Sequence, residues 1–284
     1  MGKNNIKKIF YLFLYILTCL NFSACIGSIP TPSERKSNAF SLIENKNNIF
    51  EKDIKTSNFN LFSFHKIINN CENHTINIYI EGDGLSWISR NQISSNPTPI
   101  NPIPLKLMLN DTKSNCNIYI ARPCQYINSN ICEEKYWTSH RFNDKVIQSY
   151  NEALDIIKKE YKNSNFNLIG YSGGAAVALL TASKRDDINS ITTIAGNLDT
   201  DAWTKMHNIS SLNGSLNPSD FSTKLENIKQ HHLIGTNDDI VPKEVFLSYI
   251  SKFENKKNIT YSMHEATHNC CWEDIYTNYL KGKE

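Results

Sequence analysis

The chain has 284 residues, of which 20% are charged, and a formal net charge of +2. Three lysines (Lys3, Lys7 and Lys8) lie close to the N-terminus, so the remainder of the chain carries a net charge near −1. This balance excludes a strongly basic surface for nucleic acid, and no nucleic-acid partner is expected.

The N-terminal segment is typical of an exported protein. Its lysines precede an apolar run, residues 9–20, which has the length of a signal-peptide core and is short for a membrane span. The following Phe22-Ser-Ala-Cys25 resembles the bacterial lipobox, with Cys25 as the lipidated first residue of the mature protein. We therefore expect a lipoprotein signal peptide at residues 1–24. Ile26 resembles the residue after the cysteine in lipoproteins of the outer membrane, facing the periplasm. An uncleaved anchor or simple secretion is the alternative.

Residues 25–57 are rich in Asn, Ser, Lys and Pro and are interpreted as a flexible tether. Residues 58–284 contain no internal repeat and are expected to form one domain. Within this domain, helical spacing of apolar residues predicts a core-facing helix over residues 146–161. Predicted strands alternate with helices, so the expected fold is α/β, a mostly parallel sheet with helices on both faces. The strands lie near residues 75–80, 118–121, 166–169, 191–195, 233–234 and 259–263.

The first of these strands runs into Glu81-Gly-Asp-Gly84. Glycines allow a backbone to approach a substrate closely, so the N–H of Asp83 or Gly84 is a candidate donor to an oxyanion. A plain glycine turn is the alternative. Residues 85–109 and 124–142 are expected insertions that cover this edge of the sheet, either as a lid or by simple packing.

Six cysteines remain after Cys19 and Cys25, an even number that indicates disulfides in an oxidising compartment. Cys124 and Cys132 are the easiest pair to close. Cys270 and Cys271 are expected to bridge different partners, because a disulfide between neighbours is strained. The alternative for this region is a metal site made by four residues, but the spacing lacks a Cys-x-x-Cys pair, and neither metal nor cofactor is expected. Those four residues are His264, His268, Cys270 and Cys271.

Gly170-Tyr-Ser172-Gly-Gly174 is the most informative motif. An apolar strand enters it and an alanine-rich helix leaves it, which is the context of a nucleophile elbow. A strained turn of this kind exposes a serine hydroxyl above the sheet, so Ser172 is the predicted nucleophile. The N–H of Gly173 is the predicted first donor of the oxyanion hole. A glycine-rich turn with a surface serine is the alternative.

The acid and the base of a triad must come from loops after later strands. Asp238 and Asp239 follow one such strand, and Asp199 follows the preceding one as a reserve candidate. His264 directly abuts the last strand, whereas His268 lies four residues further along its loop. The longer reach favours His268 as the base.

These motifs resemble those of the α/β-hydrolase superfamily and, more narrowly, of a group of bacterial lipoprotein serine hydrolases. The resemblance spans residues of about 75–275, nearly the whole predicted domain. It is carried by Ile80-Glu-Gly-Asp-Gly84 with Trp87, Asn96-Pro-Thr-Pro-Ile-Asn-Pro102, Ala121-Arg-Pro-Cys-Gln-Tyr126, Tyr136-Trp137-Thr, Gly170-Tyr-Ser-Gly-Gly174, Ala195-Gly-Asn-Leu-Asp199 and His268-Asn-Cys-Cys-Trp272.

The resemblance implies a serine nucleophile, an envelope location and the chain order serine, acid, histidine. It favours Asp238, which follows Gly235 by three residues as the acid does in this superfamily. The predicted protein is a serine hydrolase of carboxylic esters, thioesters or amides that uses Ser172, His268 and Asp238. Its expected partners are a small ester or acyl substrate and the membrane that holds the lipid at Cys25. A catalytically silent hydrolase fold acting as an envelope binding protein is the alternative.

Overall fold

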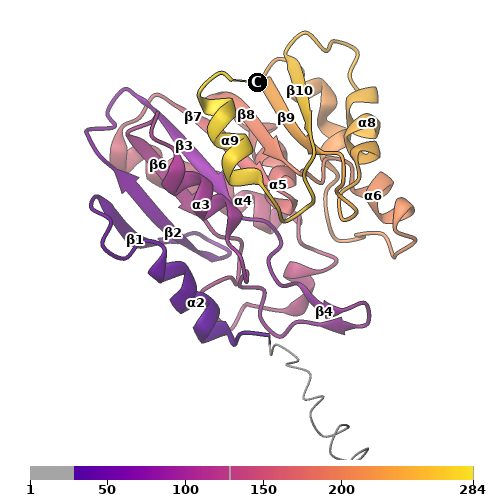
Figure 1. Ribbon diagram of the computed structural model, residues 1–284, viewed down its shortest axis with the longest axis horizontal. Helices are drawn as coiled ribbons and strands as arrows, with labels where there is room; N and C mark the ends of the chain where they lie inside the picture. Colours follow the sequence, from indigo (N-terminus) through magenta and orange to yellow (C-terminus); the bar gives the residue numbers. More distant parts are fainter. Residues whose placement is uncertain (1–28, 128, 284) are drawn as a thin grey trace, which may run out of the picture. The chain divides into compact units, whose positions relative to one another are not determined.

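The computed structural model describes residues 29–127 and 129–283, so the predicted signal peptide and Cys25 lie outside the described residues. An eight-stranded sheet forms the centre of the fold (Figure 1). The first two strands in its order pair antiparallel, as do the second and third, and all later neighbours are parallel. The order is β1 (Ile49–Lys55), β2 (Asn60–Ile67), β6 (Cys116–Ile120), β3 (Thr75–Ile80), β7 (Asn165–Tyr171), β8 (Ile188–Ile194), β9 (Lys229–Gly235) and β10 (Ile259–His264).

Helices cover both faces of this sheet, as predicted. Successive strand residues point to opposite faces, so Ile78 and Ile80 join one hydrophobic core whereas Tyr79 joins the other. The first core contains α4 (Asp144–Tyr161), α5 (Gly173–Ala182), α7 (Ser222–Leu225) and α8 (Lys243–Ser251). The second contains α2 (Pro32–Ser41), α3 (Ile103–Asn110) and α9 (Trp272–Leu280). The remaining elements are α6 (Thr200–Met206), the 3₁₀ turns η1 (Glu134–Trp137) and η2 (Pro218–Phe221), and the ribbon β4 (Trp87–Ser89) and β5 (Gln92–Ile93).

Two helices illustrate how the sequence sets this packing. In α4 the apolar spacing read from the sequence produces one buried stripe, and Asn143 caps the helix by accepting the N–H of Lys145. All ten residues of α5 are buried. Because α5 is built largely from alanine and leucine, it lies close behind the sheet and starts directly at the elbow.

The predicted tether is wrong from Pro32 onward. Residues 32–55 supply α2 and the edge strand β1, and the contacts of the chain place the start of the main folded unit at Pro32 rather than at residue 58. The polar composition hides three anchors of α2: Arg35 donates to the carbonyl oxygens of Asn96 and Thr98, Ala39 is fully buried, and Phe40 packs on Phe62.

The edge strand β1 was equally hard to see in the sequence. Its charged residues are Glu51, Lys52, Asp53 and Lys55, and charged side chains on sheet edges discourage pairing with other chains. Its ladder with β2 runs from Ile49 opposite Lys66 to Lys55 opposite Asn60. Among the described residues, no helix combines the length and the hydropathy that crossing a bilayer requires.

Candidate active site

Ser172 lies in the turn between β7 and α5, at the carboxyl edge of the sheet. Its backbone has φ 53° and ψ −121°, a conformation that few non-glycine residues adopt. The turn is held on both sides: the Ser172 N–H donates to the Ile194 carbonyl (2.9 Å), and the Ser172 carbonyl accepts the Asn197 N–H (3.1 Å). Gly174 has no room for a side chain, because a Cβ there would lie 2.3 Å from the Ile80 carbonyl oxygen. The predicted elbow therefore has the expected geometry.

The imidazole of His268 lies between Ser172 and Asp238. Its Nε2 is 2.9 Å from the Ser172 Oγ, and its Nδ1 is 2.9 Å from the Asp238 Oδ2. The other carboxylate oxygen, Oδ1, accepts the backbone N–H groups of Ile240 and Val241 at 2.9 and 2.8 Å. The Asp238 side chain is fully buried. A carboxylate fixed in this way holds the ring so that Nε2 faces the hydroxyl.

Two aromatic residues that sequence reasoning missed fix the backbone of His268. Its carbonyl oxygen accepts the Tyr171 hydroxyl (2.8 Å) and the Trp272 indole N–H (2.9 Å). The Tyr171 ring also lies 5.2 Å from the imidazole, measured between ring centroids. Tyr171 directly precedes the predicted nucleophile and Trp272 begins α9, so their positions beside the motif residues were the only available signal.

The other candidate acids, Asp199 and Asp239, and the other candidate base, His264, take no part in the two hydrogen bonds that join the triad. His264, at the end of β10, bonds through Nε2 to the Ser262 hydroxyl (2.9 Å). Asp199 caps α6 by accepting the Ala202 N–H, and it also accepts the Ser248 hydroxyl at 2.7 Å. Asp239 is exposed. Of the five candidates, the structure brings only Asp238 and His268 to Ser172 within its described residues.

The cysteines pair differently from the prediction at one point. Cys124 and Cys132 form a disulfide, as expected, and Cys71 pairs with Cys116. Cys270 and Cys271, expected to bridge separate partners, pair with each other. A disulfide between adjacent residues requires an unusual backbone. Cys271 has a φ of 79°, which turns the chain just before α9. In the described part of the chain, no group of three or more His, Cys, Asp or Glu side chains is arranged to hold a metal ion.

The predicted oxyanion residues meet beside the elbow. The loop after β3 carries Asp83 and Gly84, and the Asp83 carboxylate lies directly against Gly173. Within the same loop the Gly82 N–H donates to Glu81 (2.8 Å) and the Leu85 N–H donates to Pro97 (3.1 Å). The N–H groups of Asp83 and Gly84 lie between these two and stay the candidates for the second donor.

Glu81 is a buried acid under this loop. Burial raises the pKa of its carboxyl from the ordinary 4.5 to about 8, although hydrogen bonds from the Gly82 N–H and the Tyr119 hydroxyl and the charge of Arg122 act in the opposite direction. The side chain is therefore protonated at neutral pH. Glu81 stands where many lipases and esterases carry a histidine. Here its carboxyl group accepts hydrogen bonds from the Gly82 N–H and the Tyr119 hydroxyl and so holds the start of the loop.

The raised pKa of Glu81 makes the stability of the fold depend on pH. Between pH 4.5 and about 8 the folded protein keeps a proton that the unfolded chain releases, so the free energy of unfolding falls as pH rises. We expect this contribution to total roughly 5 kcal/mol, at about 1.4 kcal/mol per pKa unit. Urea unfolding of the wild type and of Glu81→Gln at pH 5, 7 and 9 measures it. Equal slopes against pH in the two proteins would contradict the assignment.

The insertion segments pack on the domain. Trp137 is buried, and its indole N–H donates to the Ser94 carbonyl (2.9 Å). Tyr136 is also buried and contacts Phe59 edge to face. Trp87, in the β4–β5 ribbon, is 42% exposed.

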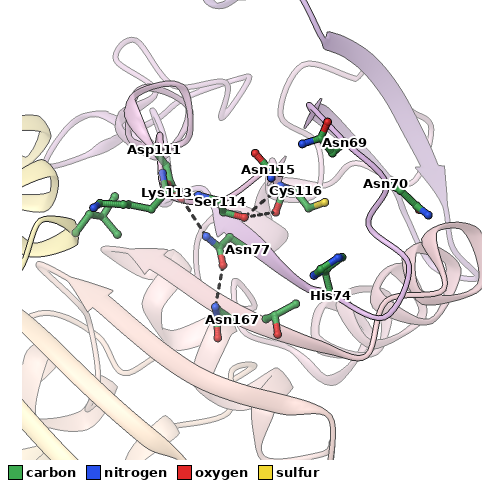
Figure 2. Close-up of a pocket in the computed structure, with 12 residues that line it drawn as sticks. Asn69, Asn70, His74, Asn77, Asp111, Lys113, Ser114, Asn115, Cys116 and Asn167 are labelled. Carbon is green, nitrogen blue, oxygen red and sulfur yellow. Dashed lines mark hydrogen bonds between the residues drawn. The ribbon is translucent and has the colours of Figure 1, made fainter.

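A polar hollow of about 510 Å³ lies at the amino ends of β3 and β6, at the opposite end of the sheet from Ser172 (Figure 2). Two of the asparagines that line it form a hydrogen-bonded chain with an acid: Asn167 donates to Asn77 (2.8 Å), and Asn77 donates to Asp111 (3.0 Å). Asp111 also accepts the Tyr79 hydroxyl at 2.7 Å.

Comparisons with known proteins identify the family and the fold. The model of one family, described as "Serine hydrolase (FSH1)", matches residues 104–270. No curated protein gives a significant match. Among solved structures, Est1E from Butyrivibrio proteoclasticus is 15% identical with a TM-score of 0.56, and the match covers 82% of this chain and 96% of that one.

Two further structures show the same likeness. An esterase from Pyrococcus furiosus is 14% identical with a TM-score of 0.59, and the match covers 90% of this chain and 93% of that one. An alpha-beta serine hydrolase homologue from Coxiella burnetii is 11% identical with a TM-score of 0.57, covering 83% and 97%. At these identities the likeness establishes the fold, which is that of the α/β-hydrolases.

Proposed function

We propose that this chain, which belongs to the serine hydrolase (FSH1) family, hydrolyses carboxylic esters through a covalent acyl-enzyme on Ser172. Thioesters and amides are the related substrates that the same chemistry admits. The observation that carries the proposal is the line of two 2.9 Å hydrogen bonds from Ser172 through His268 to Asp238. The strained backbone of Ser172 supports it, because strain of this kind is concentrated at functional sites.

In the proposed acylation step, the Ser172 Oγ attacks the carbonyl carbon of the substrate while His268 Nε2 takes the hydroxyl proton. Asp238 stabilises the imidazolium that results and keeps the ring in place. The C–O bond to the alcohol then breaks, and His268 returns the proton to the leaving oxygen. A water molecule activated by the same imidazole attacks the acyl-enzyme, which releases the carboxylic acid and restores Ser172.

The tetrahedral intermediates of both steps carry a negative oxygen. In the proposal the Gly173 N–H and the N–H of Asp83 or Gly84 donate to this oxygen. Donors that are already in place contribute much of the rate enhancement in such enzymes, and the loss of one typically costs about 10²–10³ in kcat.

Small esters are the substrate class that we favour. The likeness of the fold to that of esterases supports this choice.

A fluorophosphonate probe tests the function directly. The wild-type protein is expected to be labelled at Ser172, because the probe reacts with an activated serine hydroxyl. Ser172→Ala should lose the label and keep the melting temperature of the wild type. Labelling that persists in Ser172→Ala, or folded wild-type protein that takes up no label, would contradict the proposal and favour a silent binding protein.

We further propose that the enzyme is anchored in the bacterial envelope by lipid on Cys25. The proposed location is the outer membrane, with the enzyme facing the periplasm. The support is the basic segment, the apolar residues 9–20 and the lipobox-like Phe22-Ser-Ala-Cys25. The even number of cysteines in the remaining chain agrees with an oxidising compartment.

Cys25→Ser is expected to abolish lipid attachment and to move the protein from the membrane fraction to the soluble periplasm, because the acyl chains supply the membrane affinity. Fractionation with immunoblotting measures this, and metabolic labelling with a palmitate analogue reports the lipid itself. Cys19→Ser is the matched control and should leave both results unchanged. Membrane retention of Cys25→Ser would instead assign the anchor to residues 9–20.

A further inference from the structure

Two arginines converge on the carboxylate of Asp83. Arg122 Nη1 lies 3.0 Å from Asp83 Oδ1, and Arg141 Nη1 lies 2.6 Å from Oδ2. The arginine side chains are only 5% and 8% exposed, and that of Asp83 is 18% exposed. Burial alone would raise the pKa of Asp83, but the charges of Arg141 and Arg122 outweigh it and hold that pKa below its ordinary value. Asp83 is therefore an anion held between two buried cations.

The arginines are themselves held in place. The Nη2 of Arg122 donates to the backbone carbonyl of Arg141, and the Nε of Arg141 donates to the Thr138 carbonyl (2.7 Å). The guanidinium of Arg122 lies over the Phe142 ring, 5.2 Å from its centroid. Fixed guanidinium groups impose a fixed orientation on a carboxylate, because their donors form a rigid fork.

The held carboxylate lies against the residue that follows the nucleophile. A Cβ built on Gly173 would be 2.1 Å from Asp83 Oδ1, so the carboxylate occupies the space that a side chain at Gly173 would take. A lone negative charge in this place would repel the oxyanion of a tetrahedral intermediate, and repulsion is strong where water is excluded. Two cations beside one anion reverse the sign of the local charge.

We propose that Arg122 and Arg141 are positioning residues of the active site, which keep the Asp83 loop beside Gly173 and make the net charge there positive despite the carboxylate. This inference rests on the proposed function, since it concerns how the same site stabilises the oxyanion. The two arginines come from the loop after β6 and from the segment between η1 and α4, so elements far apart in the chain meet at this one carboxylate.

The loop has a second support that does not use the guanidinium group of either arginine, since Arg122 contributes only its backbone N–H to it. The Gln125 Nε2 donates to the Gly82 carbonyl at 3.0 Å, and the Gln125 Oε1 accepts the Arg122 N–H at 3.0 Å. A change of Arg141 to a neutral residue should therefore leave the loop attached and the protein folded. What changes is the charge beside Gly173.

The experiment compares Arg141→Gln, Asp83→Asn and the double variant in steady-state ester hydrolysis. Arg141→Gln is expected to lower kcat about 100-fold with KM within about twofold, since the effect falls on the transition state. Arg141→Gln leaves one cation, Arg122, beside one anion. The double variant removes the anion and keeps Arg122, which restores the net positive charge of the wild type, so kcat should recover at least tenfold relative to Arg141→Gln. A purely structural role would make the two losses add, because each change would then remove its own packing contacts.

Arg185→Gln is the matched control. Arg185 is also a buried arginine with two acidic partners, Asp155 and Asp187, but it lies beyond the far end of α5. Its loss should lower the melting temperature and leave kcat unchanged. If Arg141→Gln keeps the kcat of the wild type, or if the losses of the two single variants add in the double variant, this inference is overturned and the proposed function is not affected. Absence of hydrolysis by the wild type would overturn the proposed function and this inference with it.

Discussion

Ser172→Ala is expected to lower kcat for a p-nitrophenyl ester by about 10⁶, the scale seen when a triad nucleophile is removed. The expected melting temperature is unchanged, because the substitution removes a single hydroxyl. His268→Ala should cost a similar factor, and the double variant Ser172→Ala/His268→Ala should be no slower than either single variant. The reason is that the nucleophile and the base act as a unit, which is measured by comparing the three kcat values.

His264→Ala is the matched control for the base. It removes a histidine four residues away that bonds to Ser262 rather than to Ser172. Its kcat should stay within a few-fold of that of the wild type. A large loss in His264→Ala, or losses of the single variants that multiply in the double variant, would contradict the assignment of the base.

Asp238→Asn is expected to lower kcat by on the order of 10⁴ while the protein stays folded. The amide keeps the size of the carboxylate and can still accept the N–H groups of Ile240 and Val241. Its NH₂ group, however, is a donor and cannot accept a hydrogen bond from the Nδ1–H of His268, so the ring is held in the tautomer that cannot take the Ser172 proton at Nε2. Steady-state kinetics with circular dichroism of the same sample separates this loss from unfolding.

Asp199→Asn is the control for the acid. Asp199 caps α6 and accepts the Ser248 hydroxyl, so its change should lower the melting temperature and leave kcat close to that of the wild type. If Asp199→Asn instead costs more activity than Asp238→Asn, the acid of this enzyme lies one strand earlier.

Much of the parallel half of the sheet could be predicted from the sequence, because its strands are buried apolar runs and its helices have clear spacing. The elbow at Ser172 could be predicted for a different reason, since a tight turn between β7 and α5 tolerates few residues besides glycine on its flanks. His268 and Asp238 followed from their places after β10 and β9.

The parts that were missed depend on tertiary contacts. α2 and β1 are polar segments whose few anchors, such as Ala39, become visible only when the partner surface is known. Arg122 and Arg141 are 19 residues apart, and no local pattern indicates that both reach Asp83. The pairing of Cys270 with Cys271 contradicted an argument from strain, because the positive φ of Cys271 lets the chain turn there.

The position of β10 at the end of the sheet order has a consequence for how the enzyme loses activity on heating. A terminal strand has a neighbour on one side, and Tyr261 and Met263 of β10 are exposed. Fraying therefore begins more readily here than at β3 or β7, which have strands on both sides. His268 lies four residues beyond the end of β10, so opening of this edge moves the imidazole away from Ser172. On heating, activity should therefore be lost before the whole protein unfolds. The loss should be reversible on cooling, because β9 stays folded and β10 can pair with it again.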